Sequence, residues 1–124
     1  MYKNQTLQLS DLTFEPTTIG WRSPSNLAIV KYWGKYGVQL PRNPSISFTL
    51  QNAYTDTKVT YAPKTNSSDQ IEVDFFFENK PQPAFKAKIV KFLSSITDIF
   101  PFLLQIKLTI YSHNSFPHSA GIAS

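Results

Sequence analysis

The stretch from which the rest of the chain is interpreted is residues 23–35, S-P-S-N-L-A-I-V-K-Y-W-G-K. Its apolar run indicates a largely buried strand over residues 27–33. Neighbouring side chains of a strand point to opposite faces, so we expect Tyr32 to point away from Lys31 and Trp33. A lysine ammonium beside a phenol hydroxyl and an indole N–H suits the capture of an anion such as a phosphate. The alternative is a strand end with a solvated lysine and two aromatic residues at the edge of the core.

The last eleven residues, N-S-F-P-H-S-A-G-I-A-S, form a second candidate anion site. Small residues let the backbone approach a ligand closely, and they are Ser119, Ala120, Gly121, Ala123 and Ser124. If a helix begins near Gly121, its free N–H groups and positive dipole end favour an anion there, and the serine hydroxyls add hydrogen bonds. A plain helix-capping turn has a similar composition, so this alternative stays open.

Composition narrows the class of protein. With 124 residues, 41% of them apolar, and ten Phe, the chain is predicted to form one domain with a real core. There is no cysteine, which excludes a disulfide and a zinc–thiolate site. The net charge of +4 is spread along the chain, whereas a nucleic-acid binder concentrates its basic residues. Without an apolar run of membrane-span length or a signal peptide, we expect a cytoplasmic protein with neither nucleic-acid nor membrane partners.

Alternating apolar residues predict a sheet. Pro24 is expected to separate two strands, and the strands at 55–61 and 71–77 are expected to form an antiparallel hairpin across a polar turn at 62–69. The strands predicted in this way are residues 7–12, 17–22, 27–33, 46–50, 55–61, 71–77 and 106–111.

One helix is predicted, because apolar residues recur at helical spacing over residues 85–96. Pro83 lies near its start and Pro101 follows its end. Its lysines, Lys86, Lys88 and Lys91, are expected to form a solvated face. The fold class is therefore α+β, with a mostly antiparallel or mixed sheet and one helix before the small-residue loop.

A metal site is not expected. His113 and His118 lie five residues apart around a turn, but no acidic residue is near them in the sequence, and zinc needs further ligands. We expect the two histidines to flank the final loop, with His118 facing solvent.

Three segments in the same order resemble the diphosphomevalonate decarboxylases of the GHMP kinase superfamily. They are residues 23–35, residues 40–50 (L-P-R-N-P-S-I-S-F-T-L) and residues 114–124, which resemble the opening of the family's phosphate-binding loop. The resemblance implies the N-terminal part of a GHMP kinase fold. Residues 1–124 would then be an incomplete N-terminal domain, truncated inside the phosphate-binding loop, with the C-terminal domain absent.

The resemblance also implies roles for individual residues. The positions that contact the substrate in the family are Asn26, Ala28, Lys31, Tyr32 and Trp33. Lys31 would neutralise substrate charge and support a catalytic aspartate, which, like the arginine that binds the substrate carboxylate, lies further on in the family. Nucleotide phosphates would bind Pro117, Ser119, Ala120, Gly121, Ile122, Ala123 and Ser124. Pro44 stands where a serine is common in the family, so Ser45 is carried over only weakly.

The implied reaction is the ATP- and Mg²⁺-dependent conversion of mevalonate 5-diphosphate to isopentenyl diphosphate, with the fragment inactive alone. Two alternatives stay open: a related mevalonate-phosphate kinase or decarboxylase, including a mevalonate 3-kinase, and a non-catalytic anion-binding module. The full-length family implies a homodimer. For this chain we expect an oligomer, a partner chain that completes the domain, or poor solubility, because a cut sheet exposes apolar faces.

Overall fold

The computed structural model describes residues 15–122 with the exception of residues 39 and 67. The helices and strands of this part are β1 Thr17–Val30, β2 Lys35–Tyr36, β3 Leu40–Pro41, β4 Ile46–Pro63, β5 Glu72–Phe77, β6 Lys80–Pro81, α1 Pro83–Ser95, the 3-10 helix Pro101–Leu104 and β7 Ile106–Asn114. The chain divides into two compact units. Of the described residues, the first contains those within 15–20 and 57–112, and the second contains those within 21–56 and 113–122. The predicted strand at 7–12 lies outside the described residues.

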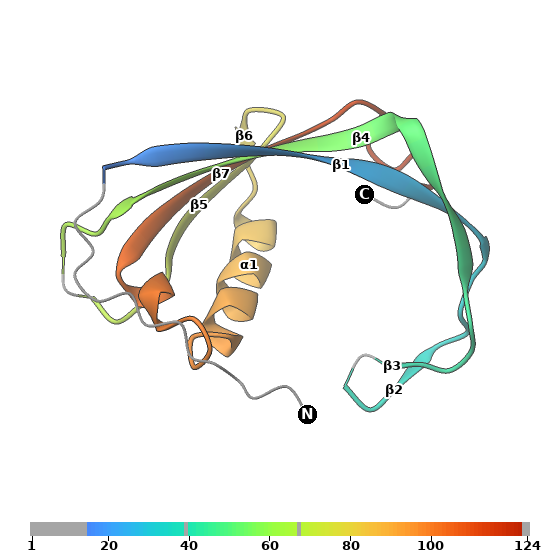
Figure 1. The fold of residues 1–124 in the computed structure, drawn as a ribbon, viewed down its shortest axis with the longest axis horizontal. Coiled ribbons are helices and arrows are strands. Elements are labelled where there is room, and N and C mark those ends of the chain that lie inside the picture. Colours follow the sequence, from blue (N-terminus) through green and yellow to red (C-terminus); the bar gives the residue numbers. More distant parts are fainter. Residues whose placement is uncertain (1–14, 39, 67, 123–124) are drawn as a thin grey trace. The chain divides into compact units, whose positions relative to one another are not determined.

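Five strands form one sheet in the order β1-β4-β7-β5-β6 (Figure 1). β5 and β7 are parallel, with Val73 opposite Leu108 and Phe75 opposite Ile110. β5 and β6 form an antiparallel hairpin, in which the turn residues Glu78 and Asn79 both have positive φ. This is the backbone that two-residue hairpin loops prefer. The sheet is mixed, which confirms the predicted α+β class.

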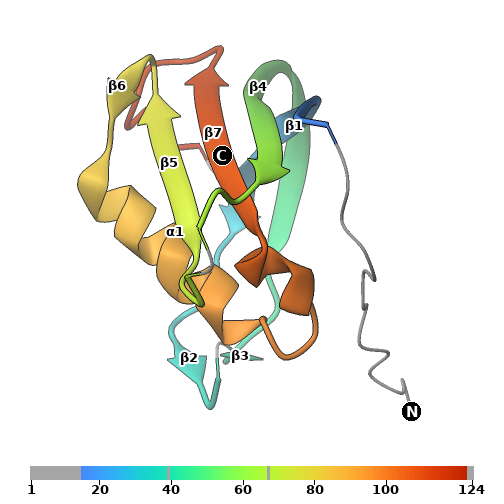
Figure 2. The same ribbon diagram turned by 90° about the vertical axis from the view of Figure 1, so that its left-hand side faces the viewer.

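The core of the first unit lies where α1 packs against β5 (Figure 2). The rings of Phe75 on β5 and Phe85 on α1 are 4.9 Å apart between centroids. The buried apolar side chains are Val73, Phe75, Leu103 and Ile106. The predicted helix is confirmed, with Pro83 in its first turn, where a missing N–H costs nothing.

The lysines of α1 differ in their exposure and in their ion pairs. Lys88 and Lys91 are exposed, as expected. Lys86, however, makes an ion pair of 3.2 Å with Asp74 on β5, and Lys107 on β7 approaches the same carboxylate at 3.5 Å. Lys86 therefore joins the helix to the sheet and is not simply part of a solvated face.

The predicted hairpin of residues 55–61 with residues 71–77 is wrong. β7 lies between β4 and β5 in the sheet, so the polar turn at 62–69 connects two strands that do not pair. The connection from β5 to β7 runs through α1, which is the usual way to join parallel neighbours. Patterns of apolar residues identify strands but do not choose their partners, and proximity in the sequence suggested the wrong one.

Three strand boundaries also differ from prediction. Pro24 does not break β1, because this strand lies at one edge of the sheet and an edge strand tolerates a missing N–H. The strands predicted at 46–50 and 55–61 are one continuous strand, β4. β1 ends at Val30, so residues 31–33 lie outside a strand and the alternation expected for Tyr32 does not apply to them.

Burial of the strands in the second unit was also wrongly predicted. Ile29, in the segment expected to be largely buried, is 59% exposed, and Ile46 and Phe48 on β4 are 59% and 58% exposed. Among its described residues the second unit has no helix that could cover these side chains, whereas α1 covers β5 in the first unit. In the described part of the chain, no helix is long and apolar enough to cross a membrane.

Candidate anion-binding site

The segment that carries Lys31, Tyr32 and Trp33 is held by one side chain, that of Asn43. The Trp33 backbone N–H donates to Asn43 Oδ1. Asn43 Nδ2 donates to the carbonyl oxygens of Lys31, at 3.2 Å, and of Pro44, at 2.9 Å. One amide group thus satisfies backbone groups on both sides of Tyr32 where the strand ladder has ended.

A short hairpin, β2 with β3, follows this segment. Arg42, which follows β3, bonds to the residues at the start of this hairpin. Its backbone N–H donates to the Gly34 carbonyl at 3.2 Å, and its Nε donates to the Lys35 carbonyl at 3.3 Å. Gly34 has φ +81°, a conformation that favours glycine. Lys35 Nζ lies 5.8 Å from the centroid of the Tyr32 ring, within the range of a cation–π contact. The cationic side chain of Lys35 therefore lies beside the Tyr32 ring.

Asn26, another predicted substrate contact, lies on β1 and pairs with β4. Thr49 Oγ1 donates to Asn26 Oδ1 at 3.2 Å. This contact occupies the amide oxygen of Asn26 and fixes which way its NH₂ group points. Ala28, the backbone contact expected two residues further along β1, is half-buried.

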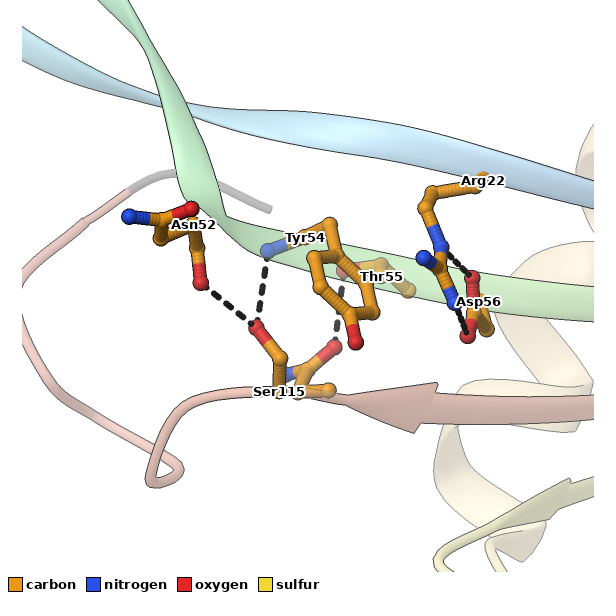
Figure 3. Close-up of polar contacts among 7 residues, drawn as sticks. Arg22, Asn52, Tyr54, Thr55, Asp56 and Ser115 are labelled. Carbon is orange, nitrogen blue, oxygen red and sulfur yellow. Dashed lines mark hydrogen bonds and ion pairs between the residues drawn. The ribbon is translucent and has the colours of Figure 1, made fainter.

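The beginning of the final loop is anchored to the middle of β4 (Figure 3). The Ser115 N–H donates to the Tyr54 carbonyl at 2.9 Å, and Ser115 Oγ accepts the Tyr54 N–H at 2.9 Å and lies 3.3 Å from the Asn52 carbonyl. Thr55 Oγ1 donates to Asn114 Oδ1 at 2.8 Å. Ser115 therefore acts as a clasp between β4 and the loop.

The side-chain contacts between β1 and β4 are unevenly spaced. Between the Arg22–Asp56 pair and the Asn26–Thr49 pair, β1 advances by four residues and β4 by seven. Ser115 pairs the Tyr54 N–H and the Asn52 carbonyl, both of which lie between these two contacts on β4.

Beside the clasp, Arg22 and Asp56 form a two-bond ion pair with distances of 2.7 and 2.8 Å (Figure 3). The Arg22 guanidinium also lies 3.9 Å from the centre of the Tyr54 ring. The hydrogen bond to Asp56 raises the pKa of Arg22. Arg22 is thus occupied as a strand-to-strand link between β1 and β4.

The rest of the final loop consists of turns and bends up to residue 122, with no helix beginning within its described part. Ser119 and Gly121 have positive φ, 63° and 81°. A Cβ built on Gly121 would meet nothing within 4 Å, and Ser119 and Ala120 are exposed. The loop therefore presents an open backbone, as close approach to an anion requires. Ala123 and Ser124 lie outside the described residues.

All of the described candidate residues belong to the second unit. Its hydrogen bonds join two of the three segments that the sequence singled out, residues 40–50 and residues 26–35. The third segment is joined through Ser115 to Asn52 and Tyr54, further along β4. Sequence reasoning missed Asn43 and Ser115. The available signal was their type, because short polar side chains between strands commonly bond to backbone groups.

The two histidines do not flank the final loop as expected, because His113 precedes it and His118 lies within it. His113 is on β7 and His118 is exposed in the loop, as expected. Among the described residues there is no group of three or more His, Cys, Asp or Glu side chains that could hold a metal ion.

Comparison with solved structures defines the class of protein. The chain is similar to the mevalonate diphosphate decarboxylase from Staphylococcus aureus, with 29% identity and a TM-score of 0.69 over 89% of this chain and 32% of that one. It is equally similar in sequence, at 29% identity and a TM-score of 0.66, to a structure described as MDDEF in complex with MVAPP, AMPPCP and magnesium, over 89% of this chain and 32% of that one. The fold is that of the N-terminal part of a GHMP kinase.

Sequence comparison identifies the family. The family model described as "Diphosphomevalonate decarboxylase-like N-terminal domain" matches residues 23–124, so the chain belongs to this family. The diphosphomevalonate decarboxylase of Candida albicans is 38% identical over 110 residues, which cover 82% of this chain and 30% of that protein. The chain therefore spans about a third of the length of this relative.

Proposed function

We propose that this chain provides the diphosphate-binding segment and the nucleotide-phosphate loop of an ATP-dependent decarboxylase that converts mevalonate 5-diphosphate to isopentenyl diphosphate. The observation that carries the proposal is the hydrogen-bonded junction at Asn43, which fixes Lys31, Tyr32 and Trp33 beside the hairpin. Membership of the decarboxylase-like family supports this choice of substrate. Residues 1–124 are proposed to form the N-terminal part of the catalytic domain.

At the proposed diphosphate site, the chain contributes positive charge and directed donors. Lys31 neutralises the anion, and Tyr32 donates its hydroxyl to a phosphate oxygen. Asn26 and the Ala28 backbone orient the substrate, and the oxygen of Asn26 is already held by Thr49. The exposed indole of Trp33 closes the edge of the site.

The final loop is proposed to hold the phosphates of ATP, through Pro117, Ser119, Ala120, Gly121, Ile122, Ala123 and Ser124. Its described residues fit such a group, because the backbone at Gly121 is open and the neighbouring side chains are small. Bound ATP supplies the phosphoryl group that activates the substrate's 3-hydroxyl. No acidic cluster for Mg²⁺ is found among the described residues, so no step is assigned to a metal on this chain.

Phosphoryl transfer depends on positioning and charge neutralisation more than on covalent help from the protein. An anion-binding segment and a phosphate loop on one compact unit provide the parts for both tasks. The aspartate and the substrate-binding arginine implied by the resemblance are proposed to come from the two-thirds of the relatives that this chain does not match.

A chimera tests this function. Residues 23–124 replace the matching part of the Candida albicans relative, and turnover is measured with mevalonate, its 5-phosphate and its 5-diphosphate. We expect turnover of the 5-diphosphate alone. Lys31→Met should lower the rate at least about tenfold, since a charge-assisted hydrogen bond is lost. Lys88→Met on the exposed face of α1 is the matched control and should leave the rate unchanged.

Two results would contradict the proposal. A folded chimera that turns over mevalonate or its 5-phosphate in preference would point to a related kinase. A folded chimera that binds pyrophosphate but turns over none of the three substrates would favour a non-catalytic anion-binding module.

A further inference from the structure

Asn43 contacts three backbone groups with one side chain, and two of them enclose Tyr32. The bonds run to the Trp33 N–H and to the Lys31 and Pro44 carbonyls. Asn43 itself is half-buried, whereas Lys31, Tyr32 and Trp33 are all exposed. Of these four residues, Asn43 alone is partly buried, and its side chain holds the backbone of the other three.

The backbone of residues 31–34 has little other support. β1 ends at Val30, so the strand ladder no longer fixes it. Trp33 is 84% exposed and Tyr32 is 43% exposed, so packing restrains them weakly. Among the described residues, this segment has two other contacts. The bond from the Arg42 N–H to the Gly34 carbonyl lies after Trp33, and the Lys35–Tyr32 contact involves only side chains.

We propose that Asn43 is a positioning residue, which holds the backbone of Lys31–Trp33 in the conformation that presents the Lys31 ammonium and the Tyr32 hydroxyl to a diphosphate. The inference rests on the proposed function for the identity of the anion. It does not rest on that function for the restraint of the backbone. A preorganised segment binds its ligand more tightly because less conformational entropy is lost on binding.

The amide group of Asn43 is suited to this task because it carries an acceptor and two donors. Aspartate retains an acceptor for the Trp33 N–H but has no donor for the two carbonyl oxygens, and it adds a negative charge near the proposed anion. Alanine loses all three bonds. A comparison of the two variants therefore distinguishes the restraint of the Trp33 N–H from the orientation of Lys31 through its carbonyl.

The experiment compares the 124-residue chain with Asn43→Ala, Asn43→Asp and the control Asn52→Ala. Asn52 is exposed, and its contact with Ser115 is made by its backbone carbonyl, which the control keeps. Hydrogen exchange of the Trp33 amide reports restraint, and titration with inorganic pyrophosphate reports anion binding.

We expect Asn43→Ala to speed exchange at Trp33 and to weaken pyrophosphate binding, each about tenfold, as the loss of a hydrogen-bond network of this size implies. Asn43→Asp should weaken pyrophosphate binding while exchange at Trp33 stays slow. Asn52→Ala should change neither quantity. If Asn43→Ala does not fold, Asn43→Asp decides the outcome through the same two measurements.

Unchanged exchange and unchanged affinity in a folded Asn43→Ala would overturn the inference. So would faster exchange without any loss of affinity in a chain that binds pyrophosphate, because the restraint would then serve no anion site. If the wild-type chain binds no pyrophosphate, the proposed function fails, and slow exchange at Trp33 that depends on Asn43 would leave the restraint standing by itself.

Discussion

Ser25 shows how a single residue can contradict its sequence context. It follows Pro24, which was expected to separate two strands. It lies instead within β1, is 1% exposed, and its Oγ has no hydrogen-bond partner among the described residues. A buried hydroxyl without a partner costs free energy, so Ser25 is a site where the sequence is not optimised for stability.

Ser25→Ala is therefore expected to stabilise the chain. Removing the unpaired hydroxyl should raise the free energy of unfolding by about 1 kcal/mol, since alanine leaves only a small void. Ser23→Ala, an exposed serine on the same strand, should change it by less than about 0.5 kcal/mol. Urea unfolding followed by tryptophan fluorescence measures both. Destabilisation by Ser25→Ala alone would show that the hydroxyl has a partner in solution.

At the scale of elements, Asp74 joins β5 to α1 and to β7. The hydrogen bond from Lys86, together with the charges of Lys86 and Lys107, lowers the pKa of Asp74 below its ordinary value of 3.8. Because the folded-state pKa is depressed, the carboxylate stabilises the fold above that ordinary value. The contribution is lost as the pH falls through the folded-state pKa.

We expect stability to fall below about pH 4 in part through Asp74. The groups are well exposed, so the contribution should be less than about 1 kcal/mol. Asp74→Asn should flatten the acid limb of the stability curve, and Asp98→Asn, outside this ion-pair cluster, should not. Urea midpoints measured from pH 2.5 to pH 6 test this. Equal acid sensitivity in the wild type and Asp74→Asn would contradict it.

The sequence predicts those elements that are determined by consecutive residues. α1, β5 and β7 were predicted because apolar periodicity is a property of consecutive residues. The pairing of β5 with β7 could not be predicted in this way, because it depends on the packing of α1 on β5 through Phe75 and Phe85. Lys31, Tyr32 and Trp33 were recognised by their pattern. Asn43 was not, because its residue type is typical of a side chain that bonds to backbone groups but does not show which groups those are.

At the scale of the whole molecule, the exposed apolar side chains of the second unit have a consequence in solution. Trp21 is 72% exposed, Val38 is 91% exposed, and Phe48 on β4 is 58% exposed. Exposed apolar surface of this kind promotes association. It belongs to the same unit as the candidate site, so coverage of this surface and function of the site are expected to be linked.

The 124-residue chain is therefore expected to associate at micromolar concentration. Size-exclusion chromatography with light scattering should give a mass above that of the monomer. The double variant Ile46→Thr, Phe48→Ser should shift the distribution toward monomer, because it removes apolar surface from one strand. Lys58→Ser, an exposed polar control on the same strand, should not. A wild-type chain that elutes as a uniform monomer would contradict the expectation.

The position of β7 also sets a limit on when the sheet can form during synthesis. β7 lies between β4 and β5, yet it comes after both of them in the sequence. Until residues 106–114 emerge, β4 and β5 have no partner between them, and their inner edges stay open to other chains. A nascent chain stalled before residue 106 should therefore depend on chaperones, whereas release of the nine residues of β7 fills the place between β4 and β5.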